Sequence, residues 1–120
     1  MRFLVLVRVD ESVDAGGPPD SLLEAVGAFR ADTTHGRWLD DGGLVPSAEA
    51  LLVRSEGGRT TVLDGPFAEA KEVIGGFFVI ESPSSEDMAA WTKGFMDLHG
   101  EHWPKLSFTA EVRQIVDPTP

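Results

Sequence analysis

The segment Ile74-Gly75-Gly76-Phe77-Phe78-Val79-Ile80-Glu81 decides the fold of this chain. Its apolar alternation predicts a strand over residues 74–81, with Phe77 and Val79 on one face and Phe78 and Ile80 on the other. Both faces of this strand are therefore apolar, and water should cover neither. Helices can cover one face of a sheet, so we expect a second sheet to cover the other.

Two segments have the spacing of amphipathic helices. In the first, Leu22, Val26 and Phe29 recur at i, i+4 and i+7 behind a capping-box pair formed by Ser21 and Glu24. We therefore expect a helix that begins at Ser21 and buries this stripe.

The second helix is expected to start at a cap formed by Ser84 and Asp87. Its buried stripe is predicted to hold Met88, Trp91 and Phe95. A loop is expected over residues 97–105, because Gly100 is a poor helix former.

The remaining strands are predicted from shorter stretches of sequence. Residues 2–9 alternate as a strand, and a final strand is expected at about 106–116. A short strand is expected around Trp38, followed by a turn at residues 40–43. Two further strands, at 50–55 and 59–63, are joined through Gly57-Gly58, which is a strong hairpin signal.

This order of elements predicts one α+β domain over residues 1–120 with a ferredoxin-like split βαβ arrangement and an inserted β-hairpin. Two helices cover one face of such a sheet. We therefore predict a homodimer in which the two uncovered sheet faces pack together.

The most distinctive motif is Asp64-Gly65-Pro66-Phe67-Ala68-Glu69-Ala70-Lys71-Glu72. Followed by Ile74-Gly-Gly-Phe-Phe, it resembles the signature of the DGPF-domain family within the YCII-related superfamily. Residues 1–7, 43–47 and 111–115 resemble the family's first strand, mid-chain turn and last strand. The resemblance implies a dimeric α+β barrel, and the family has no generally agreed reaction.

Asp64 is the first candidate site residue, with two interpretations. In the first, Asp64 is a general acid or base at the rim of a cleft, and the charges of Glu69 and Lys71 tune its pKa. We also name Glu69 and Lys71 as ligand-binding candidates. Alternatively, the Asp64 carboxylate accepts hydrogen bonds from the amides that follow it and serves only the turn.

His35 is the second catalytic candidate. The resemblance implies a His-Asp pair for proton transfer, and His35 with Asp64 is the pair that this chain offers. The alternative is a histidine that interacts with the carbonyl groups at a helix end. Where many relatives read Gly-Glu-Gly-Leu-His-Pro, this chain has Asp41-Gly42-Gly43-Leu44-Val45-Pro46, without that Glu and His.

Two further residues are ligand-binding candidates. Arg113 lies with Glu111 in a polar row of the last strand, which either lines a cavity between sheets or faces water. Trp38 either lines a pocket or packs in the core or at the dimer contact.

His99 and His102, with Asp97 nearby, raise the hypothesis of a metal site. A closed zinc site needs four ligands and the chain has no cysteine, so we expect a solvated loop there, with no metal and no cofactor.

The chain has 20 acidic and 10 basic residues, a formal charge of −10. This charge repels nucleic acid and anionic membranes, so we expect neither as a partner. No stretch has the roughly 18 apolar residues of a membrane span, and the missing export signal predicts a cytoplasmic protein.

The favoured function is binding of a small organic molecule in the dimer cleft, with acid–base chemistry at Asp64. The alternative is a non-catalytic regulatory module with a protein partner of the sigma-factor type, as the resemblance implies.

Overall fold

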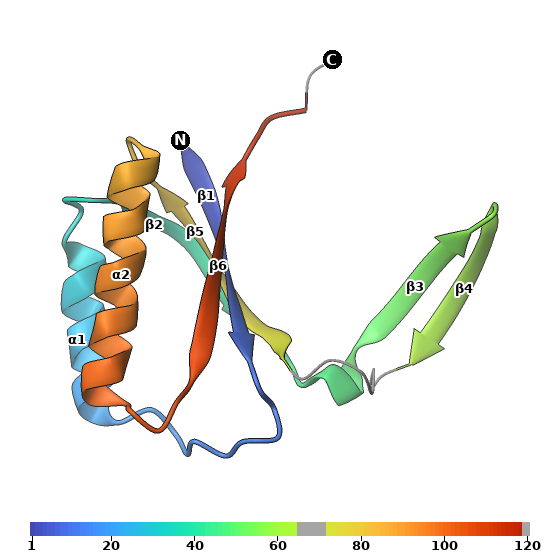
Figure 1. The fold of residues 1–120 in the computed structure, drawn as a ribbon, viewed down its shortest axis with the longest axis horizontal. Helices are drawn as coiled ribbons and strands as arrows, with labels where there is room; N and C mark the ends of the chain where they lie inside the picture. Colours follow the sequence, from blue (N-terminus) through green and yellow to red (C-terminus); the bar gives the residue numbers. More distant parts are fainter. Residues whose placement is uncertain (65–71, 119–120) are drawn as a thin grey trace.

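The computed structural model describes residues 1–64 and 72–118. The described part is an α+β fold made of a four-stranded antiparallel sheet, two α-helices on one face of it, and a separate β-hairpin (Figure 1). The elements are β1 (Arg2–Val9), α1 (Asp20–Ala31), β2 (Arg37–Gly43), the short 3-10 helix η1 (Ser47–Glu49), β3 (Leu51–Glu56), β4 (Arg59–Asp64), β5 (Val73–Glu81), α2 (Ser85–His102) and β6 (Phe108–Ile115).

The main sheet has the strand order β2-β5-β1-β6, so the two central strands are β5 and β1. This is the order expected for two split β-α-β units with a hairpin inserted between β2 and β5. No described helix is both long and apolar enough to cross a membrane.

The core lies between the sheet and α2. Strand residues Phe3, Val5 and Ile80 are buried and pack against Trp91 and Phe95 of α2. The rings of these two helix residues are stacked, with centroids 5.3 Å apart. The expected alternation of β1 and β5 and the expected stripe of α2 are thereby confirmed.

The opposite face of the sheet has no helix over it (Figure 1). The register pairs Leu4 with Val79 and Leu6 with Phe77, so these four side chains share that face. All four are only half-buried in one chain, whereas Phe3 and Val5 on the helix face are buried. We call this surface, centred on these four residues, the open sheet face.

Strand β2 is longer than expected. The predicted turn at residues 40–43 is wrong, because these residues continue β2 along β5 after a bulge between Trp38 and Asp40. Gly42 fits this strand because the ring of Phe77 lies over it. A Cβ atom on Gly42 would come within 2.6 Å of that ring.

The predicted loop over residues 97–105 is wrong for residues 97–102, because α2 continues to His102 and includes Gly100, whereas residues 103–105 do lie in the connection to β6. Its expected start is confirmed, since the Ser84 hydroxyl accepts a hydrogen bond from the backbone N–H of Asp87 at 3.0 Å.

The predicted capping box of the first helix is wrong. The helix begins at Asp20, directly after Pro19, which has an extended conformation and no capping side chain. Pro18 and Pro19 lack the N–H groups that a helix interior needs, so the helix starts after them. The Ser21 hydroxyl instead contacts the His102 imidazole at 3.1 Å.

The predicted hairpin is confirmed. Strands β3 and β4 pair from Leu51 with Asp64 to Glu56 with Arg59. Gly57 and Gly58 have φ values of 55° and 78°, which other residues rarely adopt and which the tight turn requires.

Two neighbouring leucines of α1 test this account of the core. Leu22 is 2% exposed and Leu23 is 57% exposed. We expect Leu22→Ala to lower the free energy of unfolding by about 2–5 kcal/mol and Leu23→Ala by less than about 1 kcal/mol. Urea unfolding followed by circular dichroism at one protein concentration measures both. Equal losses would contradict the assigned buried face of α1.

Candidate functional site

Charged groups border the apolar centre of the open sheet face. Arg8 on β1 lies beside Glu111 on β6, and its Nη2 atom is 2.7 Å from a Glu111 carboxylate oxygen. The Nε atom of Arg8 donates to the same oxygen at 3.1 Å. On the other edge, the register places Asp40 of β2 opposite Val79. The face is therefore an apolar floor with polar groups at its rim.

Arg113 is also at this rim, and its guanidinium has no hydrogen-bond or ion-pair partner among residues 1–64 and 72–118. The register places it opposite Leu4, and it is exposed. The predicted polar row of β6 does lie on the open sheet face, since Phe108, Ala110 and Val112 pack toward the core. A guanidinium with free donors beside an apolar floor is suited to bind a carboxylate or another oxyanion.

Asp64 is the last residue of β4, where the register pairs it with Leu51. It is exposed, and within the described part of the chain its carboxylate accepts no hydrogen bond. The predicted Asp-Gly-Pro turn lies outside the described residues, as do the candidates Glu69 and Lys71.

One chain does not bring Asp64 and His35 together. His35 lies in the connection between α1 and β2, and Figure 1 shows the end of β4 on the other side of the molecule. The His35 Nδ1 atom is instead 3.0 Å from a carboxylate oxygen of Asp87. His35 thus has an aspartate partner that sequence reasoning missed. From its sequence position, Asp87 is expected only to cap α2.

His35 and Asp87 form a hydrogen-bonded pair on the surface at the start of α2. The hydrogen bond from His35, followed by the one from the Ser84 hydroxyl, lowers the pKa of Asp87 from its usual value of 3.8. Because folding lowers this pKa, the carboxylate stabilises the fold above about pH 3.8, and that contribution is lost as the pH falls further. Both side chains are partly exposed, so the pair can exchange protons with water.

Trp38 lies in the aromatic cluster at the edge of the core. Its ring centroid is 4.7 Å from that of Phe78 and 5.8 Å from that of Trp91. Its indole N–H donates to Asp41 at 2.8 Å, and the Arg30 guanidinium lies 5.1 Å from its ring centroid. The side chain is therefore fully engaged within its own chain.

The two histidines at the end of α2 have separate partners. The His99 Nδ1–H donates to the Phe95 carbonyl at 2.8 Å, and the His99 ring lies against Phe95 and Phe108. His102 contacts Ser21. Among the described residues no group of three or more metal-ligating side chains gathers.

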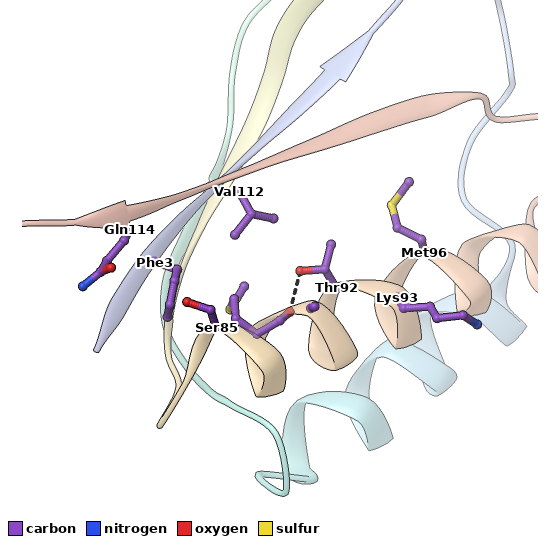
Figure 2. A pocket seen from close by; sticks show the side chains of 9 residues that line it. Phe3, Ser85, Thr92, Lys93, Met96, Val112 and Gln114 are labelled. Atoms are coloured by element: carbon purple, nitrogen blue, oxygen red, sulfur yellow. Dashed lines mark hydrogen bonds between the residues drawn. The ribbon is translucent and has the colours of Figure 1, made fainter.

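Further hollows lie in the described part of the chain. A groove of about 610 Å³ separates α2 from β6, and its apolar floor includes Phe3, Met96 and Val112 (Figure 2). The Thr92 hydroxyl, at its wall, donates to a backbone carbonyl within α2. A smaller cavity of about 310 Å³, at the end of the sheet, is bordered by Asp10 and Glu72.

The fold and these surfaces define a small α+β domain with one uncovered apolar sheet face. The YCII-related domain matches residues 1–95, and the chain therefore belongs to the YCII-related domain family. The chain is also similar to an uncharacterized protein of Rhizobium meliloti (strain 1021). The two are 46% identical over 91 residues, which cover 72% of this chain and 73% of the relative.

The contact between His35 and Asp87 can be tested by titration. In the His35→Ala variant we expect the pKa of Asp87 to rise toward 3.8, because its largest stabilising hydrogen bond is removed. Carbon-13 NMR of the side-chain carboxyl groups measures this pKa. The control is Thr34→Ala, which should raise the lowered pKa of Asp32 and leave that of Asp87 unchanged. An unchanged pKa of Asp87 without His35 would contradict the contact.

Proposed function

We propose that this protein is a homodimer that binds a small organic anion over the open sheet face, with Asp64 as its acid–base group. The observation that carries this proposal is the composition of the face. Leu4, Leu6, Phe77 and Val79 form an apolar floor, and the guanidinium of Arg113 beside it has no partner in the described part of the chain.

The homodimer is supported by the cost of leaving this floor in water. Burying apolar surface stabilises by roughly 25 cal/mol per Å², and both helices are already engaged on the other side of the sheet. Two sheets that pack face to face lie about 10 Å apart. A second copy would cover the floor in this way and complete a dimeric α+β barrel.

The chemistry of the face suggests the class of ligand. An apolar body, such as an aromatic or branched aliphatic group, would lie on Phe77 and the leucines. Its carboxylate or other oxyanion would accept hydrogen bonds from Arg113, because a guanidinium binds such groups with two parallel donors. Arg8 is already engaged by Glu111, so Arg113 is the cation available to the ligand.

Asp64 would act as the proton donor or acceptor. Its carboxylate is exposed at the end of a strand, and a carboxylate held beside a bound substrate can accept or donate a proton. Since no cysteine or tyrosine occurs in the chain, thiolate and phenolate chemistry are excluded.

The anionic probe 8-anilinonaphthalene-1-sulfonate, which joins an aromatic body to a sulfonate, tests the binding surface. We expect Arg113→Ala to raise its dissociation constant about tenfold, since a charge-assisted hydrogen bond is lost. Arg113→Lys should weaken binding less, and Arg30→Ala, which removes an exposed arginine of α1 paired with Asp41 on the other side of the sheet, should leave it unchanged. Fluorescence titration measures all three. Equal binding by wild type and Arg113→Ala would contradict the proposed role of this residue.

Solvent-deuterium exchange into small 2-keto acids tests the proposed acid–base role. We expect the wild type to accelerate exchange of the proton next to the carbonyl, and Asp64→Asn to slow the accelerated rate by at least about a hundredfold. Proton NMR follows the exchange, with the exposed Asp20→Asn variant as the control. Exchange at the wild-type rate by Asp64→Asn would contradict the role of Asp64.

A further inference from the structure

The hairpin formed by β3 and β4, from Leu51 to Asp64, projects away from the main sheet (Figure 1). We call it the arm. Its two strands form a sheet of their own, and within them every residue except Leu52 is exposed. An isolated two-stranded hairpin is at best marginally stable in water, so the arm needs a surface to lie on.

One face of the arm carries most of its exposed apolar surface. The register pairs Val53 with Val62 and Leu51 with Asp64, so these four side chains lie on the same face. Leu51, Val53 and Val62 are 64%, 57% and 59% exposed. Three adjacent large apolar side chains at such exposure are typical of an interaction surface.

The same chain has a second uncovered apolar surface, the open sheet face, which its own arm does not cover. We propose that the arm of one copy lies on the open sheet face of a second copy along its β6 edge, beside the central area where the two faces pack on each other. Each ligand site then combines Asp64 of one chain with Arg113 of the partner subunit. This arrangement rests on the proposed homodimer and explains how Asp64 reaches a site from which it is remote in its own chain.

The exchange is reciprocal under a two-fold axis, so both uncovered surfaces of both copies are covered and the assembly closes. Two six-residue strands make a ribbon roughly 20 Å long and roughly 10 Å wide. Two such ribbons, each with the surface it covers, would bury roughly 800 Å², about half of a standard interface. The remainder of the sheet faces supplies the rest.

Charge is compatible with this partner. The whole chain carries a formal charge of −10, and two such bodies repel each other. The arm carries Arg54 and Arg59 against Glu56 and Asp64, so its own formal charge is zero. It is therefore a segment that can approach a second acidic copy without adding to the repulsion. The Asp64 carboxylate would also face the opposite charge of Arg113.

A matched pair of variants on the arm tests the exchange. Val62 lies on the face proposed to dock, and its neighbour Thr61 lies on the opposite face. We expect Val62→Asp to raise the dissociation constant of the dimer at least about tenfold and Thr61→Asp to change it less than about threefold. Sedimentation equilibrium measures both, with the 12.9 kDa chain as the mass of the monomer.

Cross-linking shows where the arm lies. The chain has no cysteine, so Val62→Cys can be labelled at one position with benzophenone maleimide. The labelled protein is mixed with wild type grown in nitrogen-15, and the two are allowed to exchange subunits before illumination. We expect isotopically heavy peptides from β1, β5 or β6 in the cross-links. The same label on Thr61→Cys should give few or none of these.

The outcomes separate this inference from the proposed function. If wild type is a dimer and Val62→Asp dimerises equally well, the arm exchange is wrong while the dimer stands. Cross-links from position 62 to its own chain alone, or equal cross-links from position 61, would also overturn the exchange. If wild type is a monomer at all concentrations, both the exchange and the proposed dimer are wrong.

Discussion

The structure depends on one constraint, which is that the main sheet is apolar on both faces while its two helices cover only one. Strand β5 imposes this constraint, because Phe78 and Ile80 point into the core and Phe77 and Val79 point away from it. A small domain buries too little surface to leave such a face in water without loss of stability. The covering of the second face is therefore the central question for both stability and function.

The candidate functional groups are distributed in a way that follows from this constraint. Arg113 lies beside the uncovered face and Asp64 lies on the projecting hairpin. His35 is hydrogen-bonded to Asp87 at the start of α2. Within a single chain these candidate residues therefore do not come together. Membership of the YCII-related domain family is consistent with this fold but assigns no reaction to it, since the relative from Rhizobium meliloti is itself uncharacterized.

Much of the fold could be predicted from local patterns, such as the alternation in β1 and β5 and the glycine pair of the hairpin. The errors arose where tertiary contacts outweigh local preference. A helical glycine costs about 1 kcal/mol, but α2 continues through Gly100 because His99 packs on Phe95 and Phe108. Likewise, β5 supplies the hydrogen bonds that keep residues 40–43 in a strand. The contact of His35 with Asp87 joins residues 52 apart, and no sequence spacing indicates it.

The most direct test of the central claim is the solvent exposure of the leucine methyl groups on the open sheet face. Methyl NMR in the presence of a soluble gadolinium chelate reports this exposure, because the chelate broadens the signals of accessible methyl groups. If a second copy covers the face, the signals of Leu4 and Leu6 should stay as sharp as that of the buried Ile80, while Leu23, which is 57% exposed, is broadened. Broadening of Leu4 and Leu6 to the extent seen for Leu23 would contradict the account.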